Sequence, residues 1–393
     1  MYVGYNQEQE ALRTELRDYY SRLLTPEVEE QLARGHGVGA AMRKVVRHMG
    51  EDGWLGIGWP KEYGGRGGSA IEQFIFFDES MRAGAPVPML TINTVGPTIM
   101  NFGTDEQKEQ FLPRILKGEI HFCIGYTEPE AGTDLAALST KAVRDGDEYV
   151  INGQKIFTSL ASDADYCWLA TRTDPDAKKH KGISMFVVPM DTPGIKVVPM
   201  HLLSEHDINQ VYYDDVRVPA SALVGGENNG WGLITNQLNH ERVTLCSPGI
   251  IERALTDTRR WAQETKLADG RRVIDQEWVQ THLARVHARL EFLRLINWKV
   301  ASLDAAGQSP NPADASATKV FGTEFFIEAY RLLMEILGAR GALRGDSPEA
   351  FLAGRLERAY QGTLILTFGG GTNEIQRDLI AMFGLSMPRT PRM

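Results

Sequence analysis

The spacing of apolar residues changes twice along this chain, and that change constrains the fold more than any single motif does. Up to about residue 120, apolar side chains recur at helical spacing. They then occur in short runs rich in β-branched and aromatic residues, which turn residues separate. From Gly232 onward the helical spacing returns. The sequence therefore predicts a helical, a β and a second helical part. The clearest expected helices are 6–24, 39–52, 70–83, 104–118, 278–303 and 316–337.

We expect three domains from this order: residues 1–120, 121–228 and 229–393. The middle one is expected to be an antiparallel β unit, because no helical run separates its strands. A Rossmann domain is excluded, since the chain lacks both a Gly-x-Gly-x-x-Gly phosphate loop and a regular alternation of strands with helices.

Composition excludes several classes of function. The formal net charge of −9 over 393 residues argues against a nucleic-acid-binding face. Cys123, Cys167 and Cys246 lie far apart without metal-ligand spacing, so we expect no metal site and three small buried side chains in a reducing compartment. No apolar run approaches the ~20 residues of a membrane span, and the N-terminus lacks a signal-peptide core. A cytoplasmic location is the default expectation.

Residues 125–159 carry the strongest functional signal. A turn rich in Gly, Pro and hydroxyl groups leads into a hairpin that ends in Phe157, Thr158 and Ser159. Backbone N–H groups and hydroxyls of such a turn can hold a polar ring edge or a phosphate, and an aromatic face can cover a flat cofactor. An ordinary capped hairpin would explain either half alone. The two halves in this order favour a cofactor site.

The helix–β–helix order, the Gly-Tyr-Thr-Glu-Pro turn at 125–129 and the Gly-Gly-Gly-Thr-Asn-Glu-Ile-Gln-Arg run at 369–377 resemble the acyl-CoA dehydrogenase family over nearly the whole chain. The resemblance implies an α+β fold with an N-terminal α-helical domain, a middle antiparallel β-barrel domain and a C-terminal four-helix bundle. It also implies FAD as cofactor. The implied FAD contacts are Tyr126, Thr127, Gly132, Thr133, Phe157, Ser159, Thr372 and Glu374.

The resemblance also implies a catalytic base. The family places its glutamate at one of two positions, and at one of them this chain has Gly370, which cannot take a proton. The other position corresponds to Glu241, with Arg242 after it. Glu241 is therefore expected to remove the proton α to a thioester while hydride passes from the β-carbon to flavin N5. A solvated Glu-Arg pair on an amphipathic helix is the alternative reading. The implied acyl-CoA contacts are Thr133, Asn239, Arg242 and Gly370.

Two departures from the family bear on assembly. Lys266 and Asp269 stand where the family has an Arg and a Phe that reach a neighbouring subunit's FAD. In this the chain resembles actinobacterial acyl-CoA dehydrogenases of steroid side-chain breakdown, which are α2β2 tetramers of two paralogues. We expect such a heterotetramer or a homotetramer, a branched or bulky acyl group such as a steroid side chain, and an electron-transfer flavoprotein as acceptor. Two alternatives stay open: an acyl-CoA oxidase on the same fold, and a non-catalytic partner subunit.

Overall fold

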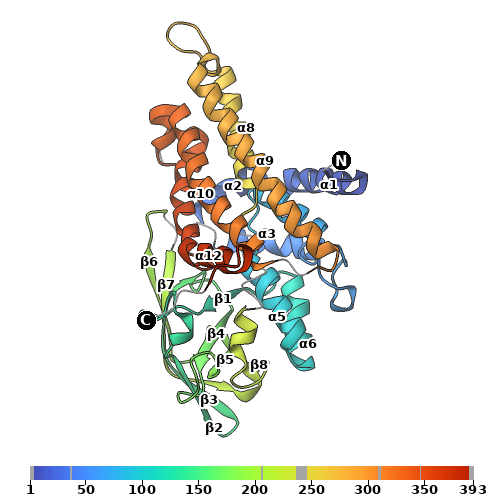
Figure 1. Cartoon of the computed structure of the whole chain (residues 1–393), viewed down its shortest axis with the longest axis vertical. Coiled ribbons are helices and arrows are strands. Elements are labelled where there is room, and N and C mark those ends of the chain that lie inside the picture. The colour runs from blue at the N-terminus through green and yellow to red at the C-terminus, as the bar shows by residue number, and fades with distance from the viewer. Residues whose placement is uncertain are drawn as a thin grey trace. The chain divides into compact units, whose positions relative to one another are not determined.

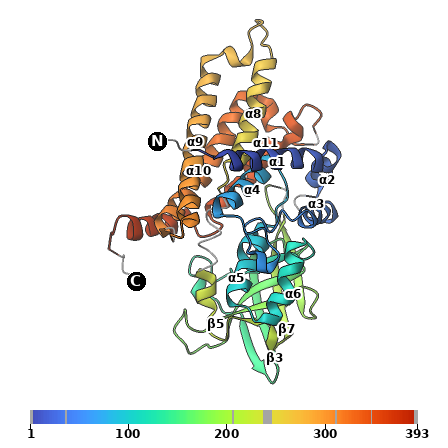
Figure 2. The same cartoon turned by 90° about the vertical axis from the view of Figure 1, so that its right-hand side faces the viewer.

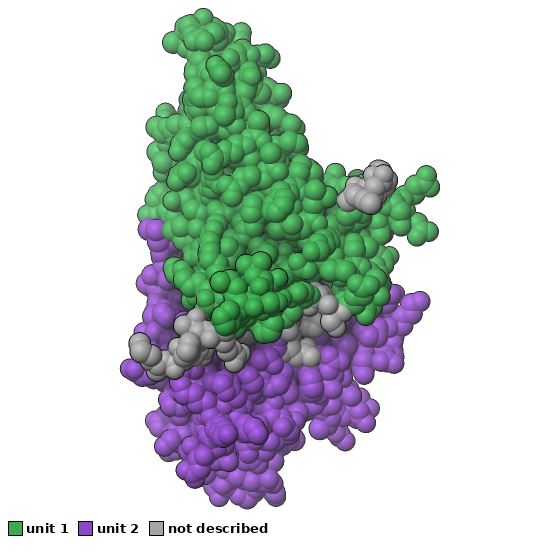
Figure 3. Space-filling model, viewed as in Figure 1, with its two compact units in different colours: residues 1–25, 68–85, 242–393 green, residues 26–67, 86–241 purple. Residues whose placement is uncertain are grey.

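The computed structural model describes residues 4–35, 38–204, 207–235, 246–308, 311–345 and 347–388 (Figure 1). The chain folds into two compact units, and each is built from segments far apart in sequence (Figure 3). Unit 1 comprises residues 1–25, 68–85 and 242–393, and unit 2 comprises residues 26–67 and 86–241. Residues of the expected first domain thus occur in both units, and the three-domain division stays a prediction.

The helices before residue 120 form largely where apolar spacing predicted them. They are α1 (Gln7–Leu23), α2 (Pro26–Arg34), α3 (Ala40–Glu51), α4 (Ala70–Ala83), α5 (Gly96–Phe102) and α6 (Asp105–Leu116). Capping explains three of the starts, because the side chains of Asn6, Ser69 and Thr104 each accept a hydrogen bond from the backbone N–H three residues later. The helices α2 and α5 were not predicted; both are short, and α5 follows a π-helical turn (Leu90–Val95).

A single mixed sheet dominates unit 2. Its strands are β1 (Phe122–Gly125), β2 (Lys141–Asp145), β3 (Glu148–Ser159), β4 (Tyr166–Arg172), β5 (Ile183–Pro189), β6 (Ile195–His201), β7 (Asp207–Pro219) and β8 (Leu223–Val224). They lie in the order β6-β7-β3-β2-β4-β5-β8, and β1 pairs with β4.

Most neighbouring strands in this sheet are antiparallel, but both β1 and β2 pair with β4 in parallel. The expectation of a wholly antiparallel unit is therefore wrong in this detail. The reason is topological: the chain leaves β1, forms the β2–β3 hairpin and only then returns as β4. No tight turn between β1 and β4 sets their relative direction.

Buried side chains of β1, β2, β3, β4, β5 and β7 form the core of the sheet. Cys123 and Cys167 lie opposite each other on β1 and β4 within it. All three cysteines are buried and free, as the sequence predicted.

Helix α10 (Pro312–Leu337) is the centre of unit 1. It packs against α8 (Gly249–Glu264), α9 (Glu277–Ala305), α11 (Arg355–Thr363) and α12 (Asn373–Leu379). Its inward side chains include Phe325, Phe326 and Leu333, which join an apolar cluster with side chains of α8, α9 and α11. The positions of α9 and α10 confirm the predicted helices at 278–303 and 316–337. No helix in the described part of the chain is long and apolar enough to cross a bilayer.

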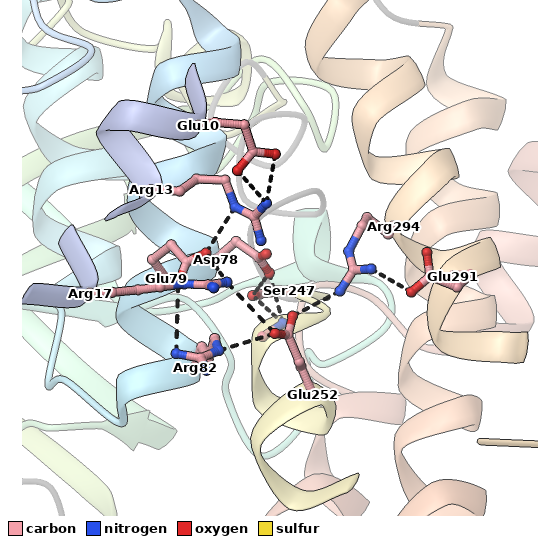
Figure 4. A network of polar contacts seen from close by, with 11 residues as sticks. Glu10, Arg13, Arg17, Asp78, Glu79, Arg82, Ser247, Glu252, Glu291 and Arg294 are labelled. Atoms are coloured by element: carbon pink, nitrogen blue, oxygen red, sulfur yellow. Dashed lines mark hydrogen bonds and ion pairs between the residues drawn. The ribbon is translucent and has the colours of Figure 1, made fainter. Parts of the chain in front are cut away.

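Helices α1 and α4 belong to unit 1 although they come from the N-terminal end of the chain, and α1 runs beside α4 (Figure 2). Two successive carboxylates of α4, Asp78 and Glu79, are buried there and connect the elements (Figure 4). Glu79 accepts hydrogen bonds from Arg13 Nε at 3.0 Å and from Arg17 Nε at 2.7 Å. Polar contacts thus hold α1 on α4 beside the apolar packing.

Candidate functional site

The turn after β1 and the C-terminal end of β3 lie side by side in unit 2. Glu128 and Ala131 close the turn by exchanging backbone hydrogen bonds of 3.0 and 3.1 Å. The N–H of Ile156 donates to the carbonyl oxygen of Thr127 at 2.9 Å, which joins the turn to β3 one residue before Phe157. The two halves of the 125–159 motif, separated in sequence, therefore form one surface feature.

Phe157 presents its ring to solvent at the end of β3. Its side chain is 58% exposed and its φ is 57°, in the left-handed region that non-glycine residues rarely adopt. The pairing of β3 with β7 shifts register between Lys155 and Thr158, so a bulge falls at this residue. Beyond the bulge, Asn209 Nδ2 on β7 donates to the carbonyl oxygen of Thr158 at 3.0 Å and holds the strand end. The bulge turns an aromatic face outward, where a flat ring could lie on it.

Tyr126 contributes to the turn differently from Phe157. Its side chain is buried, and its hydroxyl accepts a hydrogen bond from Trp168 Nε1 at 3.1 Å. Its hydroxyl is therefore already engaged inside unit 2. Gly132 and Thr133 follow the turn and are exposed, and a Cβ at Gly132 would meet only Thr127 Cγ2, at 3.9 Å.

Ser159 is exposed, whereas Thr158 is buried and its Oγ1 has no hydrogen-bond partner among the described residues. An exposed aromatic face, an open glycine and an unsatisfied hydroxyl fit a flat, polar-edged cofactor such as the flavin that the sequence implied.

A buried ion pair, which the sequence analysis missed, lies behind the turn. Lys155 Nζ is 2.8 Å from Glu128 Oε1 and donates to the carbonyl oxygen of Tyr126 at 3.1 Å. Glu128 also accepts hydrogen bonds from Ser139 N at 2.6 Å and Thr140 N at 2.8 Å. Strand periodicity could have predicted that Lys155 is buried, because Lys155 shares the inward face of β3 with Tyr149 and Ile151. A lysine on a buried face requires a carboxylate partner.

Electrostatics support the charged state of this pair. Burial alone would raise the pKa of Glu128, but the charge of Lys155 and hydrogen bonds from Lys155, Thr140 and Ser139 outweigh burial and lower that pKa to about 2. Burial also lowers the pKa of Lys155, and the Glu128 carboxylate opposes that effect. The carboxylate is therefore ionised at neutral pH.

A second group of expected site residues lies in unit 1, in the loop before α12. Gly370 and Gly371 have φ values of 69° and 91°, which favour glycine. The buried Lys319 of α10 holds this loop by donating to the carbonyl oxygen of Gly371 at 2.8 Å and to Asn373 Oδ1 at 2.7 Å. Thr372 is the N-cap of α12, and Glu374 in the first turn is exposed.

The remaining expected residues divide into two groups. The candidate base Glu241 and the candidate substrate contacts Asn239 and Arg242 lie outside the described residues. Lys266 and Asp269 lie exposed in the turn between α8 and α9. There Asp269 Oδ2 accepts a hydrogen bond from Arg271 Nε at 2.8 Å, so its carboxylate is engaged within its own turn.

Comparison with known proteins identifies the class. Models of the N-terminal, middle and C-terminal domains of acyl-CoA dehydrogenases match residues 6–119, 123–216 and 228–385. The chain belongs to the acyl-CoA dehydrogenase family, an enzyme family, and this confirms the predicted fold of N-terminal helical, middle β and C-terminal helical domains.

Within the family the chain is similar to mycobacterial proteins. It is 58% identical over 400 residues to acyl-CoA dehydrogenase FadE26 and 49% identical over 393 residues to acyl-CoA dehydrogenase FadE29, both of Mycobacterium tuberculosis, with 100% of each chain covered.

Two solved structures resemble this one over nearly their full length. A chain of the ChsE4-ChsE5 complex from Mycobacterium tuberculosis superposes with a TM-score of 0.93 at 58% identity, covering 99% of this chain and 100% of that one. A chain of the Tcur3481-Tcur3483 steroid acyl-CoA dehydrogenase gives a TM-score of 0.94 at 49% identity, with the same coverage. These likenesses confirm the predicted resemblance to the steroid group of the family.

Proposed function

We propose that this chain binds FAD and catalyses α,β-dehydrogenation of an acyl-CoA thioester to the trans-2-enoyl-CoA. The observation that carries the proposal is the outward-facing Phe157 at a bulge of β3, tied to the 126–131 turn, in a chain of this family. We assign FAD contacts to Tyr126, Thr127, Gly132, Thr133, Phe157, Ser159, Thr372 and Glu374. Bound FAD would supply the acceptor for hydride from the substrate β-carbon.

Glu241 is the proposed base. As a carboxylate it would take the proton from the α-carbon, and an apolar surrounding would raise its pKa toward neutrality and so improve proton transfer near physiological pH. Its backbone N–H would stabilise negative charge on the thioester oxygen as the proton leaves. We assign substrate contacts to Thr133, Asn239, Arg242 and Gly370, which would hold the thioester in line with the base.

We further propose that the acyl group is branched or bulky, with a steroid side chain as the first candidate. Gly370, at the alternative position for the family's base, has no side chain and a φ of 69°, which a glutamate would adopt only with strain. This leaves room that a loop carboxylate would occupy. The similarity to a protein described as a steroid acyl-CoA dehydrogenase supports the same choice.

An α2β2 assembly with a paralogous chain is the proposed quaternary state, and a homotetramer is the alternative. One similar solved structure is described as a complex of two differently named chains, ChsE4 and ChsE5. The exposed Lys266 and the engaged Asp269 offer no arginine or aromatic side chain at the positions that the family uses to reach a neighbour's FAD. An electron-transfer flavoprotein is the proposed acceptor.

A substrate panel tests the reaction. Straight-chain, branched and steroid acyl-CoA thioesters are mixed anaerobically with the flavin-loaded protein, and bleaching of the flavin absorption is followed. We expect bleaching by bulky thioesters, with none in Glu241→Gln although that variant keeps its flavin. The control is Glu264→Gln at the exposed end of α8, which should bleach as the parent does. Full turnover by Glu241→Gln with an electron acceptor would refute the assigned base.

Co-expression tests the assembly. The chain is purified alone and with a neighbouring paralogue, and flavin bound per chain is measured in each sample. We expect stoichiometric flavin only in the mixed tetramer, and full occupancy in a stable homotetramer would remove the need for a partner. Rapid reoxidation of the reduced flavin by air would favour the oxidase alternative.

A further inference from the structure

We propose that Glu128 and Lys155 are positioning residues for the cofactor: their buried ion pair orients the Tyr126–Thr127 peptide so that its N–H faces the flavin. The inference rests on the proposed FAD site. It concerns two residues that contact neither substrate nor flavin in the assignment above, and it says how the turn acquires its binding geometry.

Peptide planarity carries the first step. Lys155 Nζ lies behind the turn and draws in the carbonyl oxygen of Tyr126, at 3.1 Å. In a trans peptide the C=O and the following N–H point in opposite directions. The N–H of Thr127 therefore points away from the buried ammonium and is a donor for an acceptor atom on the ligand. Without Lys155, rotation of this peptide would cost much less.

The second step is the anchoring of Lys155 itself. Its side chain is 0% exposed and that of Glu128 is 3% exposed, so both charges are removed from water. Glu128 is held in turn by the Ser139 and Thr140 backbone N–H groups and by Ser139 Oγ, which ties the turn to the start of β2. The ammonium thus has one fixed location, and the Tyr126 carbonyl is fixed through it.

Gly125 supplies the space for this arrangement. A Cβ on Gly125 would meet Leu169 Cδ1 at 2.8 Å and Cys167 Sγ at 2.9 Å, and would touch Lys155 Cγ at 3.5 Å. The residue that begins the turn is therefore small where the lysine stem passes. Gly125, Lys155 and Glu128 thus act together to fix the conformation of the turn.

Energetic considerations indicate that the Glu128–Lys155 pair fixes the conformation of the turn and adds little to the stability of the fold. Desolvating two charges costs about as much as their attraction returns, so an apolar pair of similar volume would stabilise the fold equally well. Buried ion pairs are retained in some proteins because they specify one conformation. The conformation specified here is that of the turn assigned to the flavin.

The test compares charge removal with a matched control. Glu128→Gln, Lys155→Met and the double variant are made in the full chain, in whichever assembly binds flavin fully in the co-expression experiment above. Glu148→Gln is the control, because it is the same change at the far, exposed end of β3. FAD affinity is measured by quenching of flavin fluorescence, together with the absorption spectrum of the bound flavin and the melting temperature of the flavin-free protein.

We expect the double variant, which leaves no unpaired buried charge, to fold but to melt below the parent, because the introduced amide NH2 faces the backbone N–H of Ser139 or Thr140. Its FAD dissociation constant should rise on the order of tenfold, the effect of misplacing one hydrogen bond to the ligand, and its flavin absorption bands should shift. Glu148→Gln should change neither quantity. A double variant with the parent's affinity and spectrum would overturn the inference, whatever its melting temperature. A parent that binds no FAD would instead overturn the proposed cofactor, before any variant is made.

Discussion

The backbone N–H of Gly249 donates to Asp78 Oδ1 at 2.7 Å, so a buried carboxylate of α4 anchors the first residue of α8. Ser247 Oγ donates to the same oxygen at 2.8 Å (Figure 4). The carboxylate therefore takes the part of an N-cap side chain, which Pro248 at the cap position cannot play. The contact is so close that only glycine fits, since a Cβ on Gly249 would lie 2.1 Å from the Asp78 carbonyl oxygen.

Gly249→Ala should lower the stability of the protein by about 2–3 kcal/mol, because the added methyl group forces α8 away from α4. Gly362→Ala in α11 is the control, since a Cβ there meets nothing within 4 Å. That control should leave stability unchanged or raise it by about 0.5–1 kcal/mol. Urea unfolding followed by circular dichroism measures both, and an unchanged midpoint for Gly249→Ala would contradict the packing described.

Asp78→Asn should remove a pH dependence of stability. Burial raises the pKa of Asp78 from 3.8 to about 6; hydrogen bonds from Ser247 and Gly249 oppose the rise, and the charges of Glu79 and Glu252 add to it. Between these two values the folded protein holds a proton that the unfolded chain has released. The contribution of Asp78 to stability is therefore fully present at low pH and is lost as pH rises through about 6.

The expected loss across that window is about 3 kcal/mol. Because asparagine does not titrate, the stability of the variant relative to the parent should increase by this amount between pH 3 and pH 7. Unfolding midpoints measured at several pH values provide the test. Parallel pH profiles for the two proteins would show that Asp78 has an ordinary pKa.

Glu79→Gln should destabilise the protein by about 3 kcal/mol, the lower end of the range for breaking a buried ion pair. Its side chain is 1% exposed and pairs with Arg13 and Arg17, whose side chains are 18% and 37% exposed. Water can therefore solvate the two arginines once the carboxylate is gone, which offsets part of the lost stability. Glu30→Gln, which breaks the exposed pair with Arg34 on α2, should have no measurable effect. Equal effects of the two changes on the melting temperature would contradict the burial of Glu79.

Phe157→Gly and Phe157→Val should separate backbone strain from cofactor binding. Glycine tolerates a φ of 57°, whereas a β-branched residue does not, so we expect the valine variant to be less stable than the glycine variant by about 1–3 kcal/mol in the absence of FAD. Both variants lose the aromatic face and should bind FAD more weakly than the parent. Equal stability of the two flavin-free variants would indicate that residue 157 leaves the left-handed region in solution.

Local rules explain what the sequence predicted well. Apolar spacing predicted α1, α4 and α10, because apolar side chains recur at helical intervals in all three. Helix α1 buries one stripe, whereas α4 and α10 are buried on several faces. The start of α6 was also predictable, since Thr104 and Gln107 form a capping box within four residues of chain.

Other features depend on contacts that no local pattern encodes. The parallel pairing of β1 with β4 follows from the path of the chain between them. The positive φ of Phe157 follows from a bulge opposite β7, about 50 residues further along the chain. The inward position of Lys155 predicts that some carboxylate pairs with it. The sequence does not say which one, because Glu128 lies on another segment of the unit.

The interleaved connectivity of the two units has a consequence for synthesis on the ribosome. Helices α1 and α4 are made early, yet α8, α9 and α10, on which unit 1 depends, leave the ribosome only after all of unit 2. The face of α4 that packs against α8 and α9, with Asp78 on it, has no partner until those two helices have been made. Contacts of such long sequence separation form slowly. Nascent chains released before residue 249 should therefore contain a folded β unit, while their α1 and α4 segments stay unfolded and bind chaperones.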